Sequence, residues 1–376
     1  MSYFKFEIIK QSKKSGARVG KITTPHGVID TPNFVGVGTL GTLKGIENTL
    51  TDTLDLQLMF CNTYHLMLHP GSSVVKKAGG LHKYIQRKRP IITDSGGFQV
   101  FSLAYGSVSN ELKGKGLKKG SNTLLKIDEQ GVHFRSYRDG SPLHLTPESS
   151  IQAQKELGAD IIIPLDELPP YHIDDAAMRA LFERTHRWEK RSLDEHLKNP
   201  NQQAIYSVIH GGLSVPMRLE SAKILTNLPF DGHAIGGSFG KTADDLYSFL
   251  KALTPKLPPE KPIHLLGIGD LPTLTHALTY GIDTFDSSYP TKAARHGVLF
   301  TENGPIKLSR TRYIETFEPI EKNCPCEACQ NYTLAYLHHL FKSKEMTGQR
   351  LMSIHNIAYM VRHMQMLREK ILNDEL

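Results

Sequence analysis

Short apolar runs recur along the chain, and each of them ends in a polar residue or a glycine. Runs with apolar residues at consecutive positions are typical of strands that are buried on both faces of a sheet. Stretches with apolar residues at helical spacing separate many of these runs. The alternation predicts an α/β fold with a parallel sheet, most simply a (β/α)8 TIM barrel. The predicted barrel strands lie within residues 31–39, 56–65, 89–97, 159–167, 203–212, 232–238, 262–270 and 281–290.

Two segments depart from this alternation. The sequence GVHFRSYRDGSPLHL at 131–145 predicts a β-hairpin around the turn RDGS, which we interpret as an insertion in a barrel loop. Near the N-terminus, FKFEIIK and ARVGKITTPHGVIDT predict an antiparallel piece that precedes the barrel. We expect residues 1–376 to form a single catalytic barrel domain.

The ends of the predicted strands carry polar residues and glycines. Active sites of barrel enzymes lie at the C-terminal ends of the strands. Three carboxylates would face one mouth there and could share nucleophile, acid/base and recognition roles. Glycines let a backbone N–H approach a flat ligand, although any one Asp before a Gly could be a structural turn former. The strand-end residues are Asn62, Asp94, Asp166, His210, Gly236, Gly237, Gly267 and Asp286.

Three of the four cysteines lie within the stretch CPCEACQ at 324–330. In a protein without a disulfide framework, such a cluster is more often a metal site than a disulfide. The thiolates of Cys324, Cys326 and Cys329 favour structural zinc, which takes four protein ligands and leaves no open position for catalysis. The alternative is three reduced cysteines in a turn. Spacing alone leaves three candidates for the fourth ligand, His338, His339 and His355.

Apolar residues at helical spacing predict two helices after the cysteines, at about 331–342 and 347–372. His355 lies within the second helix, from where it could turn back onto the cysteine loop. We expect a zinc-binding helical subdomain at about 305–372, inserted into the barrel or appended to it.

Composition narrows the class of protein only slightly. Hydrophobic residues are 39% and charged residues 22% of the chain, which is ordinary for a globular protein. No signal-peptide core and no apolar run long enough to span a bilayer stand out, and four cysteines make no disulfide framework, so we expect a cytoplasmic protein without membrane contact. The net charge of +7 and the pI of about 9.0 suit an anionic partner such as nucleic acid, but suit simple solubility equally well.

Several motifs occur in an order that resembles one enzyme family. They are NTYHL at 62–66, DSGGFQVFSL at 94–103, LDE at 165–167, glycine pairs at 211–212 and 236–237, GIDTFDSSYPTKAARHG at 281–297, and the C-x-C-x-x-C…H tail. Together they resemble the tRNA-guanine transglycosylases, also called queuine tRNA-ribosyltransferases, from about residue 4 to residue 372. The resemblance implies one structural zinc ion per chain, with the ligands Cys324, Cys326, Cys329 and His355.

The resemblance also implies a base exchange in tRNA, which is a pentosyl transfer. The family removes guanine from the wobble position of the anticodon and installs a 7-deazaguanine, queuine or its precursor preQ1. Asp286 matches the nucleophile that forms a covalent ribosyl intermediate, and Asp94 matches the general acid/base. Two displacements with two carboxylates are the chemistry of retaining glycosyl transfer, and they need no nucleotide cofactor.

Recognition of the base follows from the same resemblance. Guanine presents two donors, N1–H and the exocyclic amine, beside the acceptor O6. Asp166 matches the carboxylate that faces the donors, and Gly237 matches a backbone donor to O6. The family's second donor to O6 is a glutamine, but this chain has His210, which can still donate one hydrogen bond. Phe98 matches the aromatic residue that stacks on the base, and the alternative is a core phenylalanine.

Two further departures from the family concern which base is used. Leu168 stands where bacterial members usually have cysteine. Gly240, close to Ser238, stands where bacterial members usually have valine and eukaryotic members glycine. A missing side chain at Gly240 would leave room for the cyclopentenediol of queuine, so we expect queuine to be preferred over preQ1, or at least accepted. The alternative is neutral drift in this loop.

The expected partners are nucleic acid and a second copy of the chain. Lys292 and Arg295 match basic family positions near the anticodon loop. The expected substrates are tRNAs with a GUN anticodon, of the Asp, Asn, His and Tyr type. Because the sequence ends soon after the zinc unit, we expect exchange at the wobble position rather than in the D-loop. Bacterial relatives form homodimers through the zinc region, which we expect here as well.

Two other classes of protein stay open. A non-catalytic tRNA-binding partner subunit would have lost the catalytic carboxylates, whereas Asp94 and Asp286 both remain. A zinc-dependent barrel hydrolase would need an open metal position at the mouth, where the chain offers only His210 and His264 beside the carboxylates.

Overall fold

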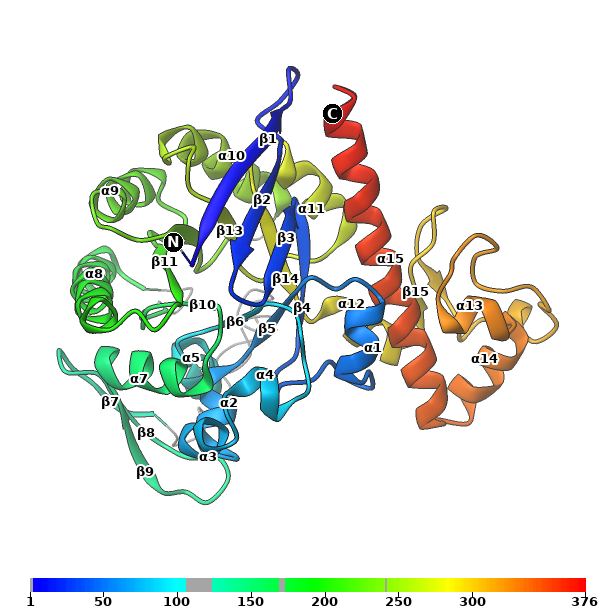
Figure 1. Cartoon of the computed structure of the whole chain (residues 1–376), viewed down its shortest axis with the longest axis horizontal. Helices are drawn as coiled ribbons and strands as arrows, with labels where there is room; N and C mark the ends of the chain where they lie inside the picture. The colour runs from blue at the N-terminus through cyan, green and yellow to red at the C-terminus, as the bar shows by residue number, and fades with distance from the viewer. Residues whose placement is uncertain (1–2, 106–123, 169–172, 241) are drawn as a thin grey trace.

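The computed structural model describes residues 3–105, 124–168, 173–240 and 242–376, and its centre is a closed parallel barrel (Figure 1). Around the barrel the strand order is β4-β5-β6-β10-β11-β12-β13-β14, and β14 pairs with β4 to close it. Each of the eight predicted apolar runs contains one of these strands, which confirms the TIM barrel. The strands are β4 (Asn33–Val37), β5 (Leu58–Cys61), β6 (Ile91–Thr93), β10 (Ile161–Ile162), β11 (Ala204–Ile209), β12 (Gly232–Ile235), β13 (Ile263–Leu265) and β14 (Thr284–Ser287).

The helices predicted between the later strands are present. Local sequence explains their ends: α7 begins with a capping box between Thr146 and Ser149, and Gly158 ends it with a φ of 73°. These helices are α7 (Pro147–Leu157), α8 (Asp175–Lys198), α9 (Val215–Thr226), α10 (Ala243–Leu253) and α11 (Leu271–Leu278). Shorter helices, which the pattern did not predict, are α1 (Asn48–Thr53), α2 (Thr63–Leu68), α3 (Ser72–Lys77), α4 (Leu81–Tyr84), α5 (Gly97–Tyr105), α12 (Tyr289–Arg295) and the 3-10 turn Thr254–Lys256.

An N-terminal antiparallel sheet closes one end of the barrel. It consists of β1 (Lys5–Gln11), β2 (Arg18–Thr24) and β3 (Gly27–Thr31), as predicted, and lies across the barrel in Figure 1. Its buried side chains Ile22 and Ile29 pack with residues of the barrel interior such as Val35 and Leu58. Because β3 leads directly into β4, this sheet covers the N-terminal ends of the strands. A functional site is therefore expected at the opposite end of the barrel, where the strands finish.

The segment between β6 and β10 forms a separate small sheet. The predicted hairpin is confirmed as β8 (Val132–Arg135) and β9 (Pro142–Leu145), and β7 (Leu124–Ile127) adds a third strand that was not predicted. The sheet buries Val132 and Phe134 in a cluster with Tyr64 and Trp188. The indole N–H of Trp188 also donates to the backbone carbonyl of Glu129 at 3.0 Å, so α8 fixes the inserted sheet in place.

After α12 the chain leaves the barrel, forms a small unit and returns to the barrel along one long helix. The unit contains β15 (Val298–Leu299), β16 (Ile306–Lys307), the 3-10 turn Thr311–Tyr313, α13 (Glu327–Asn331) and α14 (Leu334–Lys342). The returning helix α15 (Met346–Leu372) packs on β4 and α12, between the barrel and the unit (Figure 1). Asn356 on α15 joins all three parts, because its side chain bonds the backbones of Phe300, Pro290 and Val298.

The two helices predicted after the cysteines are therefore present, and the C-terminal subdomain is helical as expected. Its bounds at about 305–372 and the single-domain description stay predictions. Among the described residues, no helix is both long and apolar enough to cross a membrane.

Candidate active site and metal centre

Most of the predicted strand-end residues lie at the C-terminal rim of the barrel. Asn62 and Asp94 directly follow β5 and β6, His210 follows β11, and Asp286 lies within β14. Asp166 lies four residues beyond the end of β10. All five side chains are buried. Since parallel strands finish at one end of a barrel, the rim gathers three carboxylates and an imidazole in one place.

Asp94 is held by the segment that follows β5. Its Oδ2 accepts from Nδ2 of Asn62 at 2.7 Å, and its Oδ1 accepts from the backbone N–H of Thr63 at 2.7 Å. Burial raises the pKa of Asp94 to about 6, although these donors act in the opposite direction. A carboxyl group with a pKa near neutrality can both give and take a proton, as a general acid/base must.

Asp286 is anchored through one oxygen only. Its Oδ1 receives the backbone N–H of Gly267 at 2.9 Å and lies 3.1 Å from Nε2 of His264. The other ring nitrogen of His264 lies 2.8 Å from Oγ1 of Thr284, so a proton on Nε2 and a hydroxyl donor at Nδ1 satisfy both contacts. Oδ2 has no hydrogen bond within the described part of the chain. A fixed carboxylate with one oxygen uncommitted suits a nucleophile.

Asp166 lies near Asp94, and the charge of Asp94 acts on its carboxyl group. Its Oδ1 is 3.3 Å from the hydroxyl of Ser95, which is the residue after Asp94. Burial raises the pKa of Asp166 to about 7, and the charge of Asp94 adds to this. An ionised Asp166 is therefore unfavourable in the absence of a ligand, and a ligand that supplies hydrogen-bond donors would stabilise the ionised form.

This electrostatic situation predicts that Asp166→Asn stabilises the protein at alkaline pH. The pKa of Asp166 is about 7 in the folded chain against 3.8 for an aspartate in water. The folded state therefore binds more protons between these values, and its stability falls as the pH rises through them. Asparagine does not titrate. At pH 8 we expect a gain of about 2–4 kcal/mol, since each pKa unit corresponds to about 1.4 kcal/mol.

Urea unfolding of both proteins at pH 4 and pH 8 measures this effect. At pH 4 the two should be equally stable, and a variant less stable than wild type at pH 8 would contradict the electrostatic account.

His210 occupies the position where the resemblance expects glutamine. Its backbone N–H donates to Oγ of Ser221 at 3.1 Å, and its Nε2 lies 3.6 Å from Oδ2 of Asp166. Nε2 is also 3.5 Å from Oε1 of Glu189, a fully buried residue of α8. Glu189 was not predicted from the sequence, because a glutamate in a charged helix normally faces solvent and nothing in its spacing marks it as buried.

A buried arginine, also not predicted from the sequence, connects the two glycine-rich turns of the rim. The side chain of Arg218 on α9 is fully buried, and burial lowers the pKa of its guanidinium to about 9. Its guanidinium carbon lies 4.2 Å from the centre of the Phe249 ring. Gly237, with a φ of 85°, lies in the turn that Arg218 holds. The guanidinium donates to the carbonyls of Ile209, Gly212, Gly236 and Ser238 at 3.3, 2.8, 3.1 and 2.8 Å.

The remaining predicted residues surround this core of the site. Phe98 on α5 is 48% exposed, so the alternative of a core phenylalanine is wrong. Leu168 is half-buried against the cluster that supports the inserted sheet. Gly240 has a φ of 92°, and a Cβ there would lie 2.3 Å from the Cβ of Asp245, a capping residue of α10. Lys292 is exposed on α12, which directly follows Asp286 and β14.

The four predicted zinc ligands form one buried cluster. Nε2 of His355 lies 2.8 Å from the carbonyl of Phe300, which favours a proton on Nε2 and directs the lone pair of Nδ1 at the thiols. Nδ1 lies 3.8, 3.7 and 3.3 Å from the sulfurs of Cys324, Cys326 and Cys329. Zn–S of about 2.3 Å and Zn–N of about 2.0 Å place sulfur and nitrogen about 3.6 Å apart in a tetrahedral site.

The donor set and its spacing therefore fit a structural zinc ion. The cluster contains His355 and neither of its two sequence alternatives, His338 and His339. These three thiols and the imidazole come from α13, its preceding loop and α15, so one ion bound here would join the cysteine loop to the returning helix.

Comparison with known proteins decides the family. The sequence model of the family described as "Queuine tRNA-ribosyltransferase" matches residues 12–376. The chain belongs to the queuine tRNA-ribosyltransferase family. A queuine tRNA-ribosyltransferase from Protochlamydia amoebophila (strain UWE25) is 61% identical over 374 residues, covering 100% of this chain and 97% of the relative. Queuine tRNA-ribosyltransferases of Chlamydia trachomatis serovar L2 and Chlamydia abortus are 55% and 52% identical over 373 residues, covering 99% of both chains.

Membership in the queuine tRNA-ribosyltransferase family confirms the resemblance seen in the motifs. It also confirms that the chain is an enzyme, a transglycosylase. The individual roles within the site stay predictions.

Proposed function

We propose that this enzyme exchanges guanine at the wobble position of tRNA for a 7-deazaguanine, in queuosine modification. Oδ2 of Asp286 attacks C1′ of the ribose, the bond to guanine breaks, and Asp94 donates a proton to the departing base. The incoming base then attacks C1′, loses a proton to Asp94 and releases Asp286. The observation that carries the proposal is the buried pair at the rim of this family's barrel, one carboxylate with a free oxygen and the other with a pKa of about 6.

The base would be read by groups that lie side by side at the rim. An ionised Asp166 would accept from N1–H and the exocyclic amine of guanine, and binding these donors would offset the unfavourable burial of its charge. His210 and the backbone N–H of Gly237 would donate to O6. The half-exposed ring of Phe98 offers a face on which the base can stack.

Exchange of radiolabelled guanine into a tRNA with a GUN anticodon tests the proposal. We expect incorporation that depends on enzyme and stops when the anticodon guanine is replaced by adenine. Binding of tRNA without any exchange would instead support a non-catalytic partner subunit.

The identity of the incoming base is a further part of the proposal. The loop at Gly240 has no room for a side chain, because Asp245 occupies the place of a Cβ and also caps α10. A missing side chain at Gly240 therefore opens no space in this structure, and the expected preference for queuine rests only on the match of Gly240 to the glycine of eukaryotic members. We expect kcat/KM for queuine to exceed that for preQ1 at least about tenfold, a difference of about 1.4 kcal/mol. Competition between the two bases for one tRNA measures this, and a strong preference for preQ1 would refute it.

Basic groups near the rim support tRNA as the partner. Lys292 and Arg295 lie on α12, which follows the proposed nucleophile. Arg295 also borders a hollow of about 320 Å³ that contains Lys342 and Lys344 of the zinc unit. Such side chains attract phosphates without reading sequence. We propose that they hold the anticodon arm of tRNAs for Asp, Asn, His and Tyr, in the cytoplasm.

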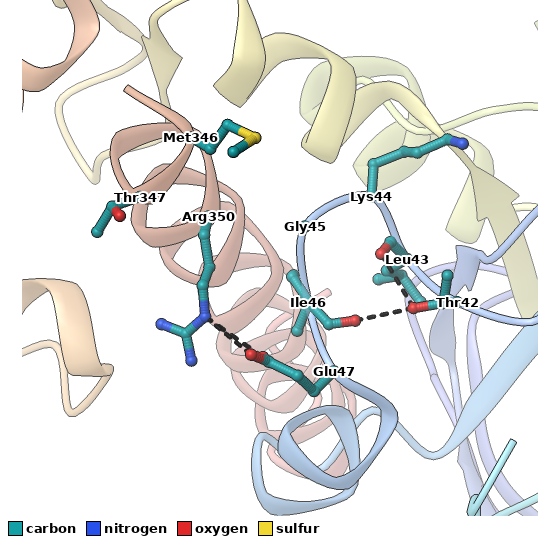
Figure 2. Close-up of a pocket in the computed structure, with 9 residues that line it drawn as sticks. All are labelled: Thr42, Leu43, Lys44, Gly45, Ile46, Glu47, Met346, Thr347 and Arg350. Atoms are coloured by element: carbon teal, nitrogen blue, oxygen red, sulfur yellow. Dashed lines mark hydrogen bonds and ion pairs between the residues drawn. The ribbon is translucent and has the colours of Figure 1, made fainter. Parts of the chain in front are cut away.

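We also propose a homodimer that forms through the zinc region. Tyr336 on α14 is 45% exposed, and its ring stacks on those of Tyr332 and His339. A hollow of about 480 Å³ lies between the loop after β4 and the start of α15, where Arg350 pairs with Glu47 and Met346 projects into solvent (Figure 2). Exposed aromatic side chains and surface hollows are typical of surfaces that receive a partner.

A further inference from the structure

Nε2 of His210 lies between two carboxyl groups. It is 3.6 Å from Oδ2 of Asp166 and 3.5 Å from Oε1 of Glu189. His210 and Glu189 are both buried, and neither Nε2 nor Oε1 makes a well-formed hydrogen bond in the described part of the chain. Buried polar atoms are almost always hydrogen-bonded, so this pair needs an explanation. The position of one proton decides whether the two atoms attract or repel each other.

His210 is neutral in this surrounding. Burial lowers its pKa well below the ordinary value, and the positive charge of Arg218 acts in the same direction. A neutral imidazole carries one proton, on Nε2 or on Nδ1. A proton on Nε2 points at the two carboxyl groups, and Nδ1 then has only a lone pair to offer a ligand. A proton on Nδ1 can be donated, but Nε2 then needs a donor opposite it.

Of the two carboxyl groups that face Nε2, Glu189 suits the role of donor. Asp166 must be ionised in the proposed function, because its oxygens accept from the base. Glu189 is fully buried, and its other oxygen already accepts from the backbone N–H of Val208 at 3.1 Å. Burial raises the pKa of Glu189 well above its ordinary value, and the charge of Asp166 raises it further. Burial and the charge of Asp166 therefore both favour the protonated form of Glu189.

We propose that Glu189 is a positioning residue that donates its carboxyl proton in a hydrogen bond to Nε2 of His210. This bond fixes the His210 proton on Nδ1, from where it can be donated to O6 of the base. The inference rests on the proposed function and deepens it. His210 needs a proton on Nδ1 only if the bound base has an acceptor at O6. Glu189 touches no substrate, and no covalent bond changes.

Steady-state guanine exchange by two variants tests the inference. Glu189→Gln keeps a neutral donor for His210 and an acceptor for Val208, so its KM for guanine should stay within about threefold of wild type. Glu189→Leu removes the donor, so its KM for guanine should rise about tenfold while the KM for tRNA stays constant. Equal KM values for guanine in wild type and Glu189→Leu, or a tenfold rise in Glu189→Gln, would overturn the inference.

Ser192→Ala is the matched control. Ser192 is also buried on α8, and its hydroxyl accepts one backbone hydrogen bond, from Leu165 at 3.3 Å. Its loss should lower stability without changing the KM for guanine. A rise equal to that of Glu189→Leu would mean that any loosening of α8 weakens base binding, and the inference would be wrong.

The protonation state can be read without activity. In protein labelled with 15N-histidine, the signals absent from His210→Gln belong to His210, and they should show a protonated Nδ1. A protonated Nε2 overturns the inference even if Glu189→Leu does not fold. If wild type exchanges no guanine at all, the proposed function itself fails, which is a different result from exchange that is insensitive to Glu189.

Discussion

Replacing Asp286 by asparagine should lower the rate of guanine exchange by at least about a thousandfold. The amide has nearly the shape of the carboxylate, and its oxygen can still accept from Gly267 and His264, so the packing at the end of β14 should survive. What is lost is the negative oxygen that we propose as the nucleophile. Initial rates with radiolabelled guanine measure the loss, and a denaturing gel shows whether a covalent protein–tRNA adduct still forms. Wild type should give the adduct and the variant none.

Asp270→Asn is the control for this change. Asp270 is an exposed carboxylate beyond the end of β13, and it caps α11 by accepting from the backbone N–H of Thr273 at 3.1 Å. Asparagine caps a helix about as well as aspartate, so exchange should stay within about twofold of wild type. If Asp286→Asn retained the adduct, another residue would have to be the nucleophile, and the proposed mechanism would be wrong.

Removing one cysteine of the cluster should abolish metal binding and loosen the zinc unit. Wild type is expected to hold one zinc ion per chain, and Cys326→Ala to hold almost none after dialysis. Structural zinc contributes about 10–16 kcal/mol of apparent binding free energy in small zinc domains, and most of this is lost with a ligand. Hydrogen exchange should therefore accelerate in α13 and α14, which depend on the cluster. The amides of the barrel strands should exchange at nearly the wild-type rate, because the strands have a core of their own.

Cys61→Ala supplies the matched control. Cys61 is the cysteine outside the cluster, fully buried at the end of β5. Its replacement should cost about 1 kcal/mol of stability and leave the zinc content at one ion per chain. If Cys326→Ala keeps its metal, the ion must be bound elsewhere, as expected for a catalytic metal at the barrel mouth.

The electrostatics of the rim connect these predictions. The pKa of Asp94 is about 6 and that of Asp166 about 7, both raised mainly by burial. Each carboxyl group lowers stability at neutral pH in the absence of a substrate, because ionising a buried group is unfavourable. A site that binds donors and moves protons needs these groups in this environment. The expected stabilisation by Asp166→Asn together with loss of exchange is the usual opposition between stability and activity.

The pattern of apolar and polar residues was enough to predict the barrel and several residues of its rim. Strands buried on both faces must be apolar at consecutive positions, so the eight runs marked them, and the chemistry of parallel barrels then placed Asp94 and Asp286 at one end. The cysteine cluster was visible because its thiols are close in sequence. Spacing could not choose the fourth ligand, since His355 reaches the cysteines only through the return of α15.

The neighbours of the chemical groups became known from the folded chain alone. His264 beside Asp286, Arg218 across the two glycine turns, and Glu189 beneath His210 each act on a partner from another element of the chain. A pattern of apolar and polar positions records whether a residue is buried on average, but not which distant atom it meets. A sequence pattern also predicts that charged residues face solvent, because most charged residues in proteins do. The residues that surround the site could therefore be found only from packing, whereas its chemical groups were already predicted from the order of the residues.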